Sequence, residues 1–146
     1  MKKLTLSQAA SGLANGEFTA ARLTADALLK IADEQGEGRR TFTHVYAQWA
    51  QEQALAADRR RAAGNPLSSL DGVPVSVKDL FDVAGEATAA GSRVLASAPA
   101  ANAHAAVVAR LLQAGAVVMG KTNMTEFAYS GLGLNPHYGT PANPWD

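Results

Sequence analysis

The chain has 146 residues, of which 47% are hydrophobic and 18% charged, a composition typical of one globular domain of ordinary size. Lysine plus arginine and aspartate plus glutamate each number 13, so the net charge is zero, which argues against broad nucleic-acid binding. Cysteine is absent, which excludes disulfides and thiolate metal sites, and the sequence shows neither a secretory signal nor an apolar run of ~18 residues, so we expect no membrane span and a cytoplasmic location.

The first part of the chain, residues 1–65, is predicted to be mainly helical. Apolar residues at helical spacing predict a first helix over 4–13 and a second helix that is capped at Thr19 and ends near Gly36. The stretch TFTHVY is β-branched and aromatic, which indicates a short strand or extended segment. A third helix is predicted over 47–64, where glycine ends it.

The second part, residues 66–146, is predicted to be α/β. A strand over 73–78, a helix over 103–115 and a strand over 116–121 follow one another, with a loop rich in small residues over 81–103. Strand, helix and strand in this order predict a parallel pair with helices outside. Because few helices are available to cover the sheet, we expect exposed apolar surface on the two strands, or a partner chain that covers it.

The predicted strand over 73–78 carries a lysine at its C-terminal end. Its valines alternate with Pro74, Ser76 and Lys78, so Ser76 and Lys78 share the second face. If both faces of the strand are covered, Lys78 is removed from water, and a desolvated lysine is able to act as a general base. The alternative is a lysine that reaches solvent and pairs with Asp79 or Asp82.

Other short patterns predict no further site. The three histidines, His44, His104 and His137, have no ligand-spaced partner, so we predict no metal site and no cofactor. The stretch MGKTN lacks the glycine spacing of a phosphate loop, and the turns GSR and YSG are too short to define an anion site or a nucleophile. The basic run 59–61 is predicted to be a solvated helix face, with a docking patch as the alternative.

Several linked motifs, in order, resemble the amidase signature family. They are LDGVPVSVKDLFDVAG, AGS, VVARLLQAGAVVMGKTNMTEFAYSG and NPHYGTPANPWD, and they extend from Leu70 to Asp146. The resemblance implies a mixed-sheet α/β/α fold, of which this chain supplies the N-terminal helices and the first βαβ units. It also implies that 1–146 is the N-terminal portion of a single domain, with a helical segment 1–65 followed by an α/β segment 66–146.

The resemblance also implies a mechanism and site residues. The family hydrolyses or transfers amides with a serine nucleophile, a second serine in a cis peptide and a lysine, and Lys78 matches that lysine. Asp79 matches the acid of the motif, with a structural role. Ala128, Tyr129 and Ser130 match the segment that lines the acyl site. A neutral amine is needed for such a base, whereas an ordinary lysine with a pKa of ~10.4 is almost wholly charged at neutral pH.

The chain departs from the family pattern in one main respect. The Gly/Ser-rich run that holds both serines follows NPW in the family, and this sequence stops at Asp146 before it. We therefore expect a truncated fold that is itself inactive, and a catalytically inactive fragment or interaction module remains the alternative function. The implied partners are a small-molecule amide and either a second copy of the chain or amidotransferase subunits, with no direct nucleic-acid contact and no membrane. A smaller departure is His104, where the family commonly has aspartate.

Overall fold

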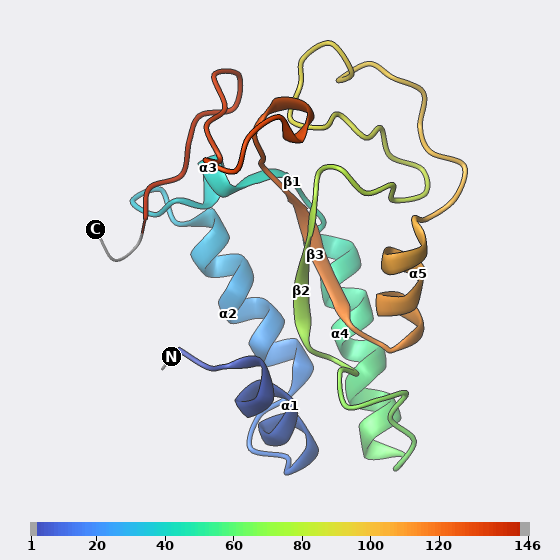
Figure 1. The fold of residues 1–146 in the computed structure, drawn as a ribbon. Helices are drawn as coiled ribbons and strands as arrows, with labels where there is room; N and C mark the ends of the chain where they lie inside the picture. The colour runs from blue at the N-terminus through green and yellow to red at the C-terminus, as the bar shows by residue number, and fades with distance from the viewer. Residues whose placement is uncertain (1–2, 144–146) are drawn as a thin grey trace. The chain divides into compact units, whose positions relative to one another are not determined.

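The structure is a computed structural model and describes residues 3–143 (Figure 1). Its elements are, in chain order, α1 (Leu6–Ala14), α2 (Ala20–Ala32), α3 (Gly38–Thr41), β1 (Phe42–Val45), α4 (Ala47–Ala62), β2 (Pro74–Lys78), α5 (Ala106–Gln113), β3 (Val117–Thr122) and a 3-10 turn, η1 (Glu126–Ala128). The predicted helices and strands are confirmed, whereas the one-turn helix α3 was not predicted. No helix among the described residues is long and apolar enough to cross a membrane.

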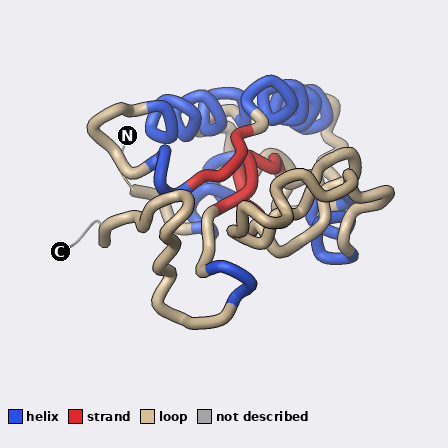
Figure 2. Tube along the Cα trace, turned by 90° about the horizontal axis from the view of Figure 1, so that it is seen from above, coloured by secondary structure: helices blue, strands red, loops and turns tan. Residues whose placement is uncertain are grey.

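The strands, drawn in red in Figure 2, form a three-stranded sheet. Their order in the sheet is β1-β3-β2. β1 pairs with β3 in the antiparallel sense, with His44 opposite Lys121. The hydrogen bonds between β2 and β3 show that the two strands run in the same direction. Val117 N–H donates to the Val73 carbonyl at the start of both strands, and Asp79 N–H donates to the Thr122 carbonyl at their end. The predicted parallel pair is therefore confirmed, and the sheet is mixed.

The chain divides into two compact units that interleave along the sequence. The first unit consists of the described parts of Met1–Lys30, Tyr46–Val75 and Arg110–Met119, and the second of those of Ile31–Val45, Ser76–Ala109 and Gly120–Asp146. The prediction of a single domain divided near residue 65 stays a prediction.

Small buried residues dominate the packing in the first unit. Ala50, Ala54 and Ala57 recur along one side of α4 and are fully buried. Gly72, at a positive φ of 85°, lies so close to this surface that an added Cβ would collide with Ala20 and press on Ala57. A side chain at this position would therefore force the helices or the turn to move.

The start of α2 is held by two kinds of cap. The Thr19 hydroxyl accepts a hydrogen bond from Arg22 N–H at 3.1 Å, as the sequence predicts. The Asp58 carboxylate, from α4, also accepts from Ala20 N–H at 2.7 Å and Ala21 N–H at 3.0 Å. An acidic group at a helix N-terminus satisfies free amides and complements the helix dipole.

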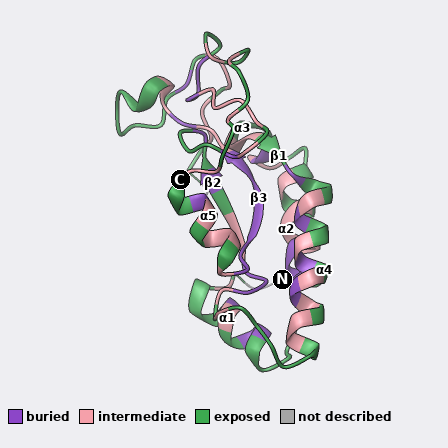
Figure 3. Ribbon diagram, turned by 90° about the vertical axis from the view of Figure 1, so that its right-hand side faces the viewer, coloured by how far each residue is buried: buried purple, intermediate pink, exposed green. Residues whose placement is uncertain are grey.

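Burial differs between the two parallel strands (Figure 3). The residues of β3 are buried from Val117 to Lys121, whereas Ser76 and Lys78 are exposed on β2. Of the two alternatives expected for these strands, exposed apolar surface is not seen among residues 3–143, because β3 is central and the exposed residues of β2 are polar. A partner chain that covers the sheet stays a prediction. In α5, Val108 is fully buried but Val107 is 44% exposed, so the predicted apolar side of this helix is narrower than expected.

Candidate active site

Lys78 is the last residue of β2, and its side chain lies exposed. Val77, before it, is buried with 4% of its surface exposed, and Ser76 shares the exposed face of the strand, as predicted. The expected removal of Lys78 from water is not met among the described residues, because β2 is an edge strand of the sheet.

Asp79, next to the candidate lysine, is fixed by four contacts and is only 2% exposed. Its backbone N–H donates to the Thr122 carbonyl at 3.0 Å, and its carbonyl accepts from Ala90 N–H at 2.9 Å. Its Oδ2 accepts from Gly91 N–H at 3.2 Å, and its Oδ1 lies 3.5 Å from Lys121 Nζ. The structural role predicted for Asp79 agrees with these contacts.

The two acids weighed as ion-pair partners of Lys78 have other partners in the structure. Asp79 pairs with Lys121, and Asp82 accepts a hydrogen bond of 2.7 Å from the Thr88 hydroxyl. Within residues 3–143, the contacts of these two carboxylates therefore give no support to the ion-pairing alternative for Lys78.

The buried lysine of this region is Lys121, which sequence reasoning missed. Its side chain is 2% exposed, and Nζ donates to the Ala87 carbonyl at 2.8 Å and to the Thr88 hydroxyl at 3.2 Å, besides contacting Asp79. The signal was present in AVVMGK, since a continuous apolar run indicates a strand covered on both faces. A lysine in such a strand needs internal partners.

A cavity of ≈ 190 Å³ lies beside this ion pair and is lined by polar side chains that include His44, Glu86 and Tyr138. Among residues 3–143, no group of three or more histidine, aspartate or glutamate side chains is arranged to hold a metal ion. The cavity therefore offers polar contacts but no cation site of ordinary ligand number.

The segment that matches the acyl site follows η1 and adopts an unusual backbone. Phe127 and Ala128 have φ values of 54° and 57°, in the left-handed region. For non-glycine residues this conformation costs about 1–2 kcal/mol each. Ala128, Tyr129 and Ser130 are all exposed, with 92% of the Tyr129 surface open to solvent.

Glu126, at the start of this segment, connects it to two other loops. Its Oε1 accepts a hydrogen bond of 2.6 Å from the buried Ser92 hydroxyl and lies 3.1 Å from His137 Nε2. The hydrogen bond from Ser92 is the main reason that the pKa of Glu126 is lowered; a smaller desolvation effect opposes it, and His137 adds to the lowering. Glu126 is therefore held as an anionic acceptor at the entrance of the turn.

Asn135 ties the same loops together through its side-chain amide. Its Nδ2 donates to the Gly91 and Met124 carbonyls, both at 2.7 Å, and the residue is 3% exposed. His104, at the position of the smaller departure, accepts a hydrogen bond from Ala84 N–H at Nδ1, 3.0 Å away. Sequence reasoning identified neither contact, because both partners lie on irregular backbone far along the chain.

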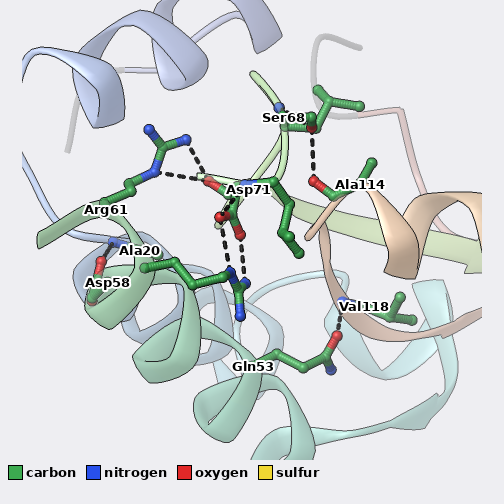
Figure 4. Close-up of polar contacts among 11 residues, drawn as sticks. Ala20, Gln53, Asp58, Arg61, Ser68, Asp71, Ala114 and Val118 are labelled. Carbon is green, nitrogen blue, oxygen red and sulfur yellow. Dashed lines mark hydrogen bonds and ion pairs between the residues drawn. The ribbon is translucent and has the colours of Figure 1, made fainter. Parts of the chain in front are cut away.

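A second buried aspartate, Asp71, lies in the first unit (Figure 4). Arg60 donates to both carboxylate oxygens, with Nε 3.0 Å from Oδ2, and Leu67 N–H donates to Oδ2 at 3.0 Å. Arg61 donates to the Asp71 backbone carbonyl. The predicted solvated face of 59–61 is therefore wrong for Arg60 and Arg61, which bind the loop before β2.

Opposing effects act on the Asp71 carboxyl. Burial alone would raise its pKa, but the hydrogen bonds from Arg60 and Leu67 and the charges of Arg60 and Arg61 outweigh burial and lower the pKa below the ordinary range. Gly115 lies so close that an added Cβ would collide with the carboxylate. This cluster is a structural clamp, since its donors leave the carboxylate oxygens occupied.

Comparison with known families decides the broad class of the chain. The family model described as Amidase matches residues 24–146, which is most of the chain. The chain belongs to the amidase family.

Curated relatives match the chain from end to end. A subunit of glutamyl-tRNA(Gln) amidotransferase from Chloroflexus aggregans is 44% identical over 98% of this chain and 29% of its own length. The protein of the same name from Azotobacter vinelandii is 44% identical over 100% of this chain and 30% of its length. The chain thus spans less than a third of the length of the relatives it matches.

Solved structures of amidases share the fold. The peptide amidase from Stenotrophomonas maltophilia is 30% identical, with a TM-score of 0.84, and the match covers 99% of this chain and 31% of that one. A chain from a vestigial protein complex that reveals the evolutionary origins of an s-triazine catabolic enzyme is 42% identical, with a TM-score of 0.86, and the match covers 93% of this chain and 30% of that one. The mixed α/β class predicted from the sequence is therefore confirmed.

Proposed function

We propose that the protein to which this chain contributes cleaves a carboxamide, either by hydrolysis to a carboxylic acid and ammonia or by transfer of the ammonia to a second substrate. The observation that carries this proposal is the family match, together with relatives of 42–44% identity along the whole chain. The relatives are named as amidotransferase subunits and the structural neighbours include a peptide amidase, so both outcomes of amide cleavage have support.

In this proposal Lys78 is the general base of a Ser–cis-Ser–Lys arrangement. The lysine takes a proton from the nucleophilic serine through the second serine, and both serines belong to the Gly/Ser-rich run that this sequence does not contain. The position of Lys78 at the carboxyl end of a parallel strand supports the role, since open α/β sheets collect ligands there. The rigid setting of Asp79 supports it too, because it fixes the backbone from which the amine projects.

Ala128, Tyr129 and Ser130 are proposed to line the acyl side of the substrate. Their exposure supports this role, since none of the three is used to fill the core of the second unit. Backbone N–H groups near the nucleophile would then stabilise the oxyanion that develops in the transition state.

The base role is tested in the full-length protein by measuring kcat/KM against pH for Lys78→Ala and Lys78→Arg. Lys78→Ala should lose about 10²–10⁴-fold, the usual contribution of a general base. Lys78→Arg should fail as well, because a guanidinium stays charged and cannot accept the proton. Lys30→Ala is the matched control, since Lys30 is an exposed lysine on α2. An active Lys78→Arg enzyme would return Lys78 to an ion-pairing role.

The isolated 146-residue chain should be inactive towards aliphatic and aryl amides, because a base without a nucleophile has nothing to activate. Turnover by the purified chain that Lys78→Ala abolishes would contradict the assignment of the nucleophile to a later segment. An inactive chain that still binds an amidotransferase subunit would favour the alternative, a structural or interaction role. An ammonia-transfer activity should need such partner subunits, whereas hydrolysis should not.

A further inference from the structure

We propose that Glu126 is a positioning residue, which holds the left-handed turn at Phe127 and Ala128 and thereby sets how Tyr129 and Ser130 meet the acyl group of the substrate. The inference rests on the proposed function, since it concerns the segment proposed to line the acyl site. It adds a residue that acts through the backbone of the turn.

The turn has two hydrogen bonds of its own, from Ala128 N–H to the Thr125 carbonyl at 2.9 Å and from Tyr129 N–H to the Glu126 carbonyl at 3.2 Å, and its backbone conformation calls for an anchor outside it as well. Two consecutive non-glycine residues, Phe127 and Ala128, have positive φ, a conformation that L-residues leave unless their surroundings enforce it. Burial cannot supply the restraint, since Phe127 is 53% exposed and Tyr129 is 92% exposed. The restraint beyond the turn's own hydrogen bonds must therefore come from hydrogen bonds between the start of the turn and other loops.

Those hydrogen bonds converge on Glu126 and on the loop at 90–92. The Ser92 hydroxyl donates to Glu126 Oε1 at 2.6 Å, and Ser92 is fully buried, so its position is fixed by packing. Phe127 N–H donates to the Ala90 carbonyl at 2.9 Å, which ties the next residue to the same loop. Glu126 thus links the exposed turn to the buried hydroxyl of Ser92.

The same loop also holds the residue after Lys78. Ala90 N–H and Gly91 N–H donate to the backbone carbonyl and the carboxylate of Asp79. Residues 90–92, within the second unit, therefore form hydrogen bonds both to the residue after the proposed base and to the start of the proposed acyl-site turn. If Glu126 has a positioning role, replacing it should change which substrates react well and should leave the pH dependence that Lys78 sets unchanged.

The test measures kcat, KM and the pH profile of the full-length protein with acetamide, benzamide and glutamine, by ammonia release. Glu126→Ala should raise KM and change the ratio of kcat/KM between the best and the poorest of these amides by about tenfold or more, since a ~1 Å misplacement can cost ~10²-fold. The pH profile should keep its shape. Glu52→Ala, an exposed glutamate on α4, is the matched control and should leave both quantities unchanged.

Two further variants separate positioning from loss of structure. Ser92→Ala removes the buried donor and should change the substrate ratio in the same direction as Glu126→Ala. Adding Ala128→Gly to Glu126→Ala should restore part of the ratio, because glycine adopts positive φ without the steric cost that the anchor offsets.

Equal loss of kcat for every amide in Glu126→Ala and Ser92→Ala, with KM and the substrate ratio unchanged, would overturn this inference alone. It would show that the contact only maintains the folded fraction. Absence of ammonia release by the wild-type protein from every amide would overturn the proposed function, and this inference with it, whereas full turnover by Lys78→Ala would overturn only the base role of Lys78. A changed ratio with partial rescue by Ala128→Gly supports the positioning role.

Discussion

The two units each contain a buried aspartate that is paired with a cation, and the pairs are built differently. Asp71, fully buried, receives a two-pronged contact from Arg60, whose side chain is 30% exposed. Asp79, 2% exposed, faces a single amine of Lys121 at 3.5 Å, and that lysine is itself only 2% exposed. The Arg60–Asp71 pair therefore keeps its cation in contact with water, whereas the Lys121–Asp79 pair removes both charges from water.

The difference shows what each pair contributes. A forked guanidinium matches a carboxylate in geometry and keeps part of its hydration, so the Arg60–Asp71 pair suits a clamp between a helix and a loop. A wholly buried pair meets a large desolvation cost, which only good internal contacts offset. Lys121 and Asp79 therefore need the neighbouring carbonyl, hydroxyl and amide groups that surround them, and these contacts fix the strand end beside the candidate base.

The largest expected effect is that of Lys121→Met. The substitution leaves Asp79 buried without its cation, and breaking a buried pair in this way costs about 3–5 kcal/mol of folding free energy. Urea unfolding of the protein measures it. Lys121→Met combined with Asp79→Asn is the control and should be less destabilised than Lys121→Met alone, because no charge is left unpaired. A loss below about 1 kcal/mol would mean that water reaches the pair.

A smaller effect is expected for Arg60→Met. Asp71 keeps the hydrogen bond from Leu67 N–H and the nearby charge of Arg61, and the space left by Arg60 opens towards water. The loss should be about 1–3 kcal/mol, the range for a buried acceptor that loses a partner. If Arg60→Met costs as much as Lys121→Met in the same urea experiment, the contrast between the two pairs is wrong.

The smallest expected effect, and the one most specific to Asp71, is a loss of folding stability as the pH falls into the acid range. Because the folded pKa of Asp71 is lowered, its carboxylate contributes stability that is present above the unfolded value of ~3.9 and is lost as the pH falls from there through the folded pKa. The difference in stability between the wild type and Asp71→Asn should therefore shrink over that interval. A difference that stays constant down to the acid limit would contradict the lowered pKa.

Local patterns predicted the elements well because each depends on neighbouring residues. The helix over 47–62 and the strand over 74–78 follow from spacing and from glycine and proline at their ends. The helix α3 was missed because it opens on Gly38, a poor helix former, which lies so near Ile31 that an added Cβ would collide with it. Tertiary contact, and not propensity, sets that turn.

The candidate site was predicted only in part, for a reason of topology. Alternation along one strand shows which side chains share a face, but not whether the strand is central or at an edge. The expectation of a buried lysine was therefore placed on Lys78, whereas β3 is the central strand and Lys121 is the buried lysine. The contacts of Glu126 with Ser92 and His137 join loops that no local pattern relates.

The segment between β2 and α5 contains no helix or strand, yet two of its amides are hydrogen-bonded to one buried aspartate. Ala90 N–H and Gly91 N–H both donate to Asp79, and both residues are buried. Amide protons held in this way exchange with deuterium only when the surrounding structure opens. These two amides should therefore retain protection comparable to that of β3, so the irregular segment carries a rigid point at its centre.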